Sequence, residues 1–231
     1  MFMTINFKKI KALCFDVDGT LRDTDDQYVV KLERTFRSLS RIIPNRDVHT
    51  FARRIVMTLD TPINAVYTMM DWLKLDGAMI NILEKFQQVQ LRKTKASLPL
   101  VPGTLESLEI LGRHFPMAIV SARGEKGTLE FLEHHQIADK FVCIASGQTT
   151  QHTKPWPDPI FWCAEQMNVP ADTCLMIGDT TVDIRAGRAA SAQTVGVLSG
   201  FGSSRELTRA GANLIAKNVA ELTKIFHNTL A

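Results

Sequence analysis

The chain has 231 residues, 45% of them hydrophobic and 22% charged, which is the balance of an ordinary globular protein. This length fits one large domain or a domain with a substantial insert. A formal net charge of +3 at pH 7 is too small to indicate a nucleic-acid partner. It leaves room for a local basic site that takes an anionic substrate.

Cysteine spacing and hydropathy indicate the compartment. None of the four cysteines forms a Cys-x-x-Cys pair or a zinc-binding spacing with histidine, so we expect free, buried thiols in a reducing, cytoplasmic setting. They are Cys14, Cys143, Cys163 and Cys174. Residues 1–11 contain no sustained apolar run, and no run approaches the roughly 18 to 20 residues that span a bilayer. We therefore expect neither a signal peptide nor a membrane partner.

The first apolar run, residues 12–17, predicts a buried strand because it is nearly continuous rather than alternating. Asp16 and Asp18 lie at its carboxyl end, where open α/β sheets carry their functional sites. Gly19 permits a sharp turn and lets backbone N–H groups approach an anion. A strand that ends in an Asp-rich turn is the structural alternative, and this stretch alone leaves it open.

The next segment, residues 22–97, predicts helices only, with turn signals at Pro44-Asn45 and Asp76-Gly77 and a helix start at Thr61-Pro62. A helical block between the first strand and the rest of an α/β chain indicates an inserted domain. We therefore predict a core domain of residues 1–21 and 98–231 and an all-α insert of residues 22–97.

After residue 98 the pattern alternates between strands and helices. The strands are predicted at 116–120, 141–145, 173–177, 193–197 and 213–215, and the helices at 103–113, 124–135, 157–168, 180–190, 204–210 and from 219 onward. Alternation of this length implies a doubly wound, mainly parallel sheet, so the predicted fold class is α/β with an inserted helical bundle.

Polar residues follow the first two of these strands. Ser121 comes directly after residues 116–120, where its hydroxyl and the following backbone N–H groups suit a phosphate, although a serine here is equally suited to cap a helix. Lys154 stands in a loop with three prolines, which fix its backbone. The alternative for a single lysine is a solvated surface charge.

Asp179 and Asp183 follow the strand at residues 173–177. Residues four apart share a helix face, and two carboxylates so placed repel each other unless a cation or a lysine lies between them. A capping Asp followed by a surface Asp is the alternative interpretation.

Taken together and in this order, the four motifs resemble the signature of the haloacid dehalogenase (HAD) superfamily, in its phosphatase form Asp-x-Asp-Gly-Thr. The resemblance covers essentially the whole core and implies a Rossmann-like fold. The helical insert is similar to the cap of the phosphoglycolate phosphatase and β-phosphoglucomutase branch.

The resemblance implies roles for the residues that match these motifs. Asp16 is the nucleophile and Asp18 the general acid and base. Mg²⁺ is implied as the cofactor, with Asp16, the Asp18 carbonyl and Asp179 as ligands and Asp183 nearby or acting through water. The residues expected to bind the phosphate are Gly19, Thr20, Ser121, Ala122 and Lys154.

The function implied is a phosphatase for a small phosphorylated metabolite, with a phosphoglycolate-like monoester as the best single substrate. Family dehalogenases lack the second Asp of the first motif, so Asp18 favours phosphate esters. Two alternatives remain: a sugar-phosphate phosphomutase that uses the same residues, and a catalytically idle binding module. The expected assembly is a monomer or a homodimer.

Two residues depart from the pattern of this family. Arg22 stands where an apolar residue is more common, and Arg123 stands where Asn, Gly or Lys is more usual. A contact with the substrate's anion is one interpretation of both, and we favour ordinary surface cations. We interpret His152, two residues before Lys154, as an ordinary loop histidine.

Overall fold

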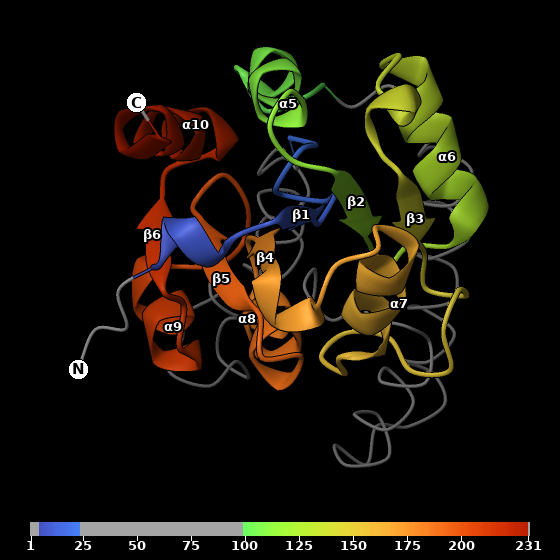
Figure 1. Cartoon of the computed structure of the whole chain (residues 1–231). Helices are drawn as coiled ribbons and strands as arrows, with labels where there is room; N and C mark the ends of the chain where they lie inside the picture. The colour runs from blue at the N-terminus through green and yellow to red at the C-terminus, as the bar shows by residue number, and fades with distance from the viewer. Residues whose placement is uncertain (1–4, 24–98, 231) are drawn as a thin grey trace, which may run out of the picture. The chain divides into compact units, whose positions relative to one another are not determined.

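The computed structural model describes residues 5–23 and 99–230 (Figure 1), with side chains described up to Phe226. These residues belong to one compact unit, which comprises Met1–Thr24 and Leu98–Ala231. The predicted helical insert lies outside the described residues, apart from Arg22 and Asp23, and its boundaries stay a prediction.

A six-stranded sheet in the order β3-β2-β1-β4-β5-β6 forms the centre of this unit, and every neighbouring pair of strands is parallel. The strands are β1 (Ala12–Phe15), β2 (Met117–Val120), β3 (Cys143–Ala145), β4 (Cys174–Gly178), β5 (Gln193–Val197) and β6 (Leu214–Ala216). The helices are α5 (Thr104–Gly112), α6 (Glu125–His134), α7 (Asp158–Gln166), α8 (Thr181–Ala189), α9 (Ser204–Ala210) and α10 (Val219–Leu230).

Side chains of the strands alternate between two apolar cores, one on each face of the sheet. Leu13 and Phe15 of β1 pack in a core with α5, α6 and α10, whereas Ala12 and Cys14 pack in a core with α7 and α8. Helices therefore cover both faces (Figure 1), and the predicted doubly wound α/β fold is confirmed for the described core.

Strand β1 ends at Phe15, earlier than the predicted end at Val17. The carbonyl of Val17 accepts backbone hydrogen bonds from Thr20, Leu21 and Arg22 at 2.9 to 3.3 Å. The chain has therefore already left the sheet and closed a turn at Val17, and this turn carries Asp18 and Gly19.

The strand order brings three of the predicted motifs to one edge of the sheet. Strand β1 lies between β2 and β4, with Phe15 level with both Ile119 and Ile177. Because the strands are parallel, the residues that follow their carboxyl ends meet at the same edge. Asp16, Ser121 and Asp179 are such residues.

The four cysteines are free, as predicted, and all except the half-buried Cys143 are fully enclosed. Among the described residues, none of the helices has both the length and the apolar character needed to cross a membrane.

Candidate active site

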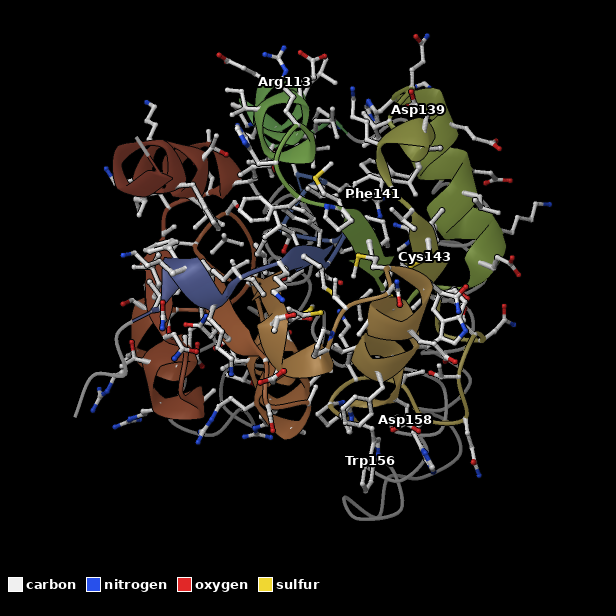
Figure 2. All side chains as sticks on the ribbon, viewed as in Figure 1. Arg113, Asp139, Phe141, Cys143, Trp156 and Asp158 are labelled. Atoms are coloured by element: carbon white, nitrogen blue, oxygen red, sulfur yellow. The ribbon has the colours of Figure 1, made fainter. Side chains whose placement is uncertain are left out.

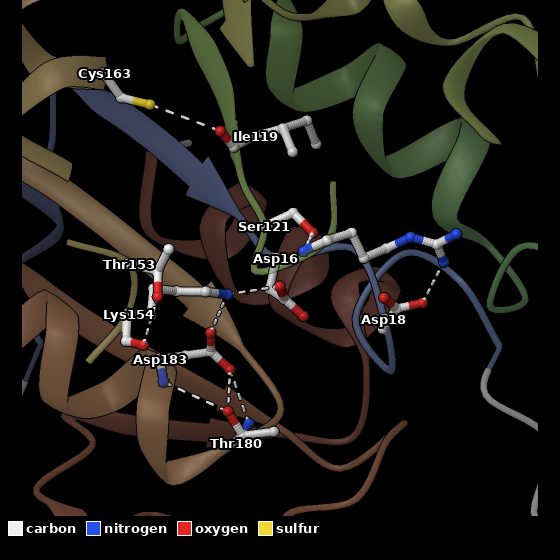
Figure 3. A network of polar contacts seen from close by, with 10 residues as sticks. Asp16, Asp18, Ile119, Ser121, Thr153, Lys154, Cys163, Thr180 and Asp183 are labelled. Atoms are coloured by element: carbon white, nitrogen blue, oxygen red, sulfur yellow. Dashed lines mark hydrogen bonds and ion pairs between the residues drawn. The ribbon is translucent and has the colours of Figure 1, made fainter. Parts of the chain in front are cut away.

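Lys154 lies at the centre of the site and joins two carboxylates that are far apart in the sequence (Figure 3). Its Nζ donates to Asp16 Oδ1 at 2.6 Å and to Asp183 Oδ1 at 2.5 Å. Only 4% of the lysine is exposed. The surface alternative for Lys154 is therefore wrong, because a buried ammonium group needs partners such as these.

The loop before α7 positions Lys154. Pro155 and Pro157 restrict its backbone, Pro159 lies in the first turn of α7, and the N–H of Trp156 donates to the carbonyl of Thr153 at 3.0 Å. The lysine thus extends from a stiffened turn toward the carboxyl end of β1. Because proline fixes φ, less backbone conformational entropy is lost when this loop becomes ordered.

Asp183 has two functions at the start of α8. Its Oδ2 accepts hydrogen bonds from the backbone N–H of Thr180 at 2.9 Å and from the Thr180 hydroxyl at 2.6 Å, which completes a capping box. Its Oδ1 is left to contact Lys154. The helix cap therefore fixes the carboxylate in the orientation that the lysine needs.

Asp179 follows β4 and lies in a cradle of backbone. Its Oδ2 accepts the N–H of Phe201 at 2.7 Å, while its buried Oδ1 has no hydrogen-bond partner among the described residues. A Cβ added at Gly19 would lie 2.4 Å from this Oδ2, and one added at Gly200 would lie 2.1 Å from it. Only glycine fits at these two positions, and Gly19 also has a φ of +80°.

Three carboxylates meet around this cradle. Asp16, Asp179 and Asp183 are buried, and each offers an oxygen within 4.8 Å of the others. When all three are ionised, Lys154 offsets one negative charge and two remain. Oxygen ligands, an excess of two negative charges and an unpartnered buried oxygen fit a hard divalent cation such as Mg²⁺.

The electrostatics of the cluster reflect the same imbalance. Burial raises the pKa of Asp16 to about 7, with Lys154 opposing the shift and Asp183 adding to it. Burial, reinforced by Asp16 and Asp183, raises the pKa of Asp179 well above its usual range. For Lys154 burial favours the neutral form, but the carboxylates of Asp16 and Asp183 outweigh it and raise the pKa.

Asp18 contacts two arginines instead of Lys154. Its Oδ1 accepts a hydrogen bond from Arg22 Nη1 at 2.5 Å and another from Arg123 Nη1 at 3.0 Å. Burial raises the pKa of Asp18, while Arg123 and Lys154 oppose the shift. The interpretation of Arg22 and Arg123 as surface cations is wrong, because both are ion-paired to a predicted catalytic residue.

The other predicted phosphate-binding residues line the turns beside these carboxylates. The buried Ser121 hydroxyl accepts the backbone N–H of Arg123 at 3.2 Å, and Ala122 lies between them in the sequence. The buried Thr20 hydroxyl has no hydrogen-bond partner among the described residues. The Gly19 amide donates to the Arg22 carbonyl at 2.9 Å, so this N–H is engaged within the turn.

Sequence reasoning missed the loop that follows β5. Phe201 donates its N–H to Asp179, Gly200 makes room for that carboxylate, and the Ser199 hydroxyl donates to the Gly19 carbonyl at 2.7 Å. The available signal was the Ser-Gly-Phe-Gly run at the end of a predicted strand, where a close backbone approach is common.

His152 pairs outside this network. Its Nδ1 lies 2.9 Å from Asp158 Oδ1, and its ring lies 5.3 Å from that of the exposed Trp156. Both contacts are local, and they are consistent with an ordinary loop histidine.

A buried carboxylate–lysine cluster at the carboxyl edge of a doubly wound sheet places this protein with the α/β proteins that bind ligands beyond the carboxyl ends of their strands. The family model described as haloacid dehalogenase-like hydrolase matches residues 13–197. The chain belongs to this family and is a hydrolase, which confirms the resemblance drawn from its motifs.

Individual relatives agree with the family assignment. The chain is 26% identical over 222 residues to a phosphoglycolate phosphatase of Vibrio parahaemolyticus, covering 94% of this chain and 96% of the relative. Among solved structures, a hydrolase from Pseudomonas syringae has a TM-score of 0.74 and 23% identity, covering 94% and 98% of the two chains. A putative beta-phosphoglucomutase from Thermotoga maritima has a TM-score of 0.67 and 20% identity, covering 95% and 99%.

Proposed function

We propose that this hydrolase is a Mg²⁺-dependent phosphatase that cleaves a small phosphomonoester, similar to phosphoglycolate, through an aspartyl-phosphate on Asp16. The observation that carries the proposal is the buried contact of Lys154 with both Asp16 and Asp183. It supplies one fixed positive charge beside a carboxylate nucleophile, which is what an incoming phosphate dianion requires.

In the first step a carboxylate oxygen of Asp16 attacks phosphorus, and the bond from phosphorus to the ester oxygen breaks. Asp18 gives its proton to the departing oxygen, so the alcohol leaves neutral. In the second step Asp18 takes a proton from water, the water oxygen attacks phosphorus, and phosphate leaves Asp16 as the free carboxylate. The protonated Asp18 is then ready for the next cycle.

The phosphoryl oxygens need donors in both steps. Lys154 and the Ser121 hydroxyl are proposed as the principal ones, with the backbone around Ala122 and the turn of Gly19 and Thr20 beside them. The unpartnered Thr20 hydroxyl supports this assignment, since a buried hydroxyl without a hydrogen bond is unfavourable until a ligand arrives.

Asp16, Asp179, Asp183 and the backbone of Asp18 are proposed to hold the Mg²⁺. The unpartnered Oδ1 of Asp179 and the clustering of the three carboxylates support this assignment. When bound, the cation neutralises negative charge and lets the phosphate dianion approach Asp16. The ordering of Asp183 by its helix cap keeps one carboxylate in place before the cation arrives.

The substrate class is supported by the relative named phosphoglycolate phosphatase. A sugar-phosphate phosphomutase would use the same residues, but the likeness to a putative beta-phosphoglucomutase concerns the fold alone. An idle binding module would not need a buried lysine paired with a nucleophilic aspartate.

The experiment is phosphate release from a panel of phosphomonoesters, measured with Mg²⁺ and with chelator. The panel contains phosphoglycolate, sugar phosphates, nucleotides, pyrophosphate and p-nitrophenyl phosphate. We expect metal-dependent release, fastest from small phosphate esters. Absence of release from every compound by folded protein would contradict the proposal, and slow release that requires a bisphosphate would favour the mutase.

A further inference from the structure

Two guanidinium groups meet on one carboxylate oxygen at the site, and the reaction steps above use neither of them. Arg22 and Arg123 both contact Asp18 Oδ1, although Arg123 lies 105 residues away in the sequence. An ionised Asp18 offsets only one of the two positive charges, and the protonated Asp18 of the proposed cycle offsets neither. Among the three residues of this contact the balance is therefore positive, whereas the cluster of Asp16, Asp179, Asp183 and Lys154 carries excess negative charge.

We propose that Arg123 binds a negatively charged group on the leaving group of the substrate, so that the enzyme selects phosphate esters of short, acidic alcohols. The inference rests on the proposed function and specifies its substrate class. The anionic group is a carboxylate or a second phosphate, because a guanidinium fork binds either of them through paired N–H donors.

The location of Asp18 makes Arg123 a contact for the leaving group. A general acid must lie within hydrogen-bond reach of the oxygen to which it gives its proton. Arg123 donates to this same carboxylate at 3.0 Å, so its guanidinium lies on the leaving-group side of the phosphoryl group. A charge only a few bonds from the ester oxygen comes within its reach, and a charge on a long chain does not.

The loop after β2 links this contact to the bound phosphate. The Arg123 backbone N–H donates to the Ser121 hydroxyl at 3.2 Å, so the proposed phosphate donor and the proposed anion contact are held in one short turn. Gly127 leaves space for the guanidinium, since a Cβ there would lie 3.2 Å from Arg123 Nη2.

Exposure distinguishes the two arginines. The Arg123 side chain is 21% exposed, whereas that of Arg22 is 11% exposed. The Arg22 guanidinium also lies 6.0 Å from the centre of the Phe131 ring, a cation–π distance at which the side chain is held by its neighbours. Arg123 is thus the arginine with the more exposed side chain.

The test compares two matched substrate pairs in the full-length protein with Mg²⁺. Phosphoglycolate is paired with its neutral amide, and ethylene glycol bisphosphate is paired with 2-hydroxyethyl phosphate. For the wild type we expect kcat/KM to be higher for the charged member of at least one pair. The pair that shows the preference identifies the anion as a carboxylate or a phosphate.

Substitution of Arg123 then tests the assignment. Arg123→Gln is expected to lower the charged-to-neutral ratio of kcat/KM by on the order of tenfold to a hundredfold, the usual effect of a charge-assisted hydrogen bond. Arg123→Lys keeps the charge without the fork and should give an intermediate ratio. Arg113→Gln is the matched control, because Arg113 is exposed at the end of α5 and should leave the ratio unchanged (Figure 2).

The outcomes separate this inference from the function on which it rests. Equal losses on charged and neutral substrates in Arg123→Gln would overturn the inference and leave Arg123 as a support for Asp18. A wild type that hydrolyses p-nitrophenyl phosphate but does not distinguish the members of either pair would also overturn it, with the phosphatase activity standing. Absence of hydrolysis of any substrate, the aryl phosphate included, would overturn both.

Discussion

Asp16 is subject to two opposing effects at the scale of a single residue. Burial raises its pKa to about 7, whereas the contact with Lys154 favours the ionised form. In the proposed mechanism the Asp16 carboxylate must be ionised to attack phosphorus. The proposal therefore gives Lys154 two roles, which are to offset the charge of the phosphate and to favour the ionised form of Asp16.

Replacing Asp16 tests this assignment directly. Asp16→Asn keeps the volume of the side chain and removes the nucleophilic oxygen, so we expect phosphate release to fall by at least about 10³-fold while the fold is retained. Asp139→Asn is the control, because Asp139 is exposed on the surface (Figure 2) and should remain fully active. Circular dichroism checks that the fold is retained, and phosphate release measures the loss of activity. Turnover by folded Asp16→Asn would refute the proposed role of Asp16.

At the scale of elements, the close packing of α8 against the sheet holds Asp183 in place. A Cβ on Gly187 would lie 2.4 Å from Thr194 Cγ2 and 2.9 Å from Met176 Cβ. Thr194 and Met176 belong to β5 and β4 and are fully buried. The helix approaches the sheet this closely only because glycine stands at their point of contact.

Gly187→Ala should therefore destabilise the protein, although alanine is the better helix former. Overpacking in a core costs about 1 to 3 kcal/mol. Replacing glycine by alanine inside a helix gains about 1 kcal/mol of helix propensity, so the cost of overpacking equals or exceeds this gain. We expect a lower urea midpoint and, since α8 carries Asp183, a weaker response to Mg²⁺. The exposed Arg185 of the same helix offers the control Arg185→Ala, and a Gly187→Ala midpoint at or above that of the wild type would argue against tight packing here.

At the scale of the whole molecule, the carboxylate cluster couples folding to pH. Asp16 has a pKa of about 7 in place of the usual 3.8, and the pKa of Asp179 is also raised. Between pH 3.8 and about pH 7 the folded protein binds more protons at these carboxylates than the unfolded chain does. Its free energy of unfolding therefore falls as pH rises through this range. The stabilisation due to the raised pKa of Lys154 is fully present below pH 10.5, so it does not change in this range.

The metal-free protein should accordingly melt at a lower temperature at about pH 7.5 than at about pH 5, and Mg²⁺ should raise Tm more at the higher pH. Thermal unfolding with chelator and with Mg²⁺ at each pH measures both effects. Asp16→Asn should show a smaller dependence on pH. A Mg²⁺ effect that is equal at the two pH values would contradict the linkage between the cation and the carboxylates.

The sequence predicts the strands and helices of this protein better than it predicts the contacts between distant residues. The strand at 193–197 and the helix at 204–210 have the predicted bounds, because hydrophobic periodicity and capping residues act locally. The two arginines on Asp18 were misjudged, because residue type gives the usual exposure of an arginine and not its exposure here. The role of the loop at Gly200 and Phe201 was missed, since its glycines signal only a close backbone approach and residue identity does not show which carboxylate a backbone N–H contacts.

The sequence by itself determined the order of strands and helices, the α/β class and the acidic and basic groups of the site, since these depend on neighbouring residues. Only the tertiary structure decided which groups meet: Lys154 with Asp16 across 138 positions, and Arg123 with Asp18 across 105. The physical reason is the parallel sheet, whose strand order brings distant strand ends to one edge, where burial makes each charge depend on its partner.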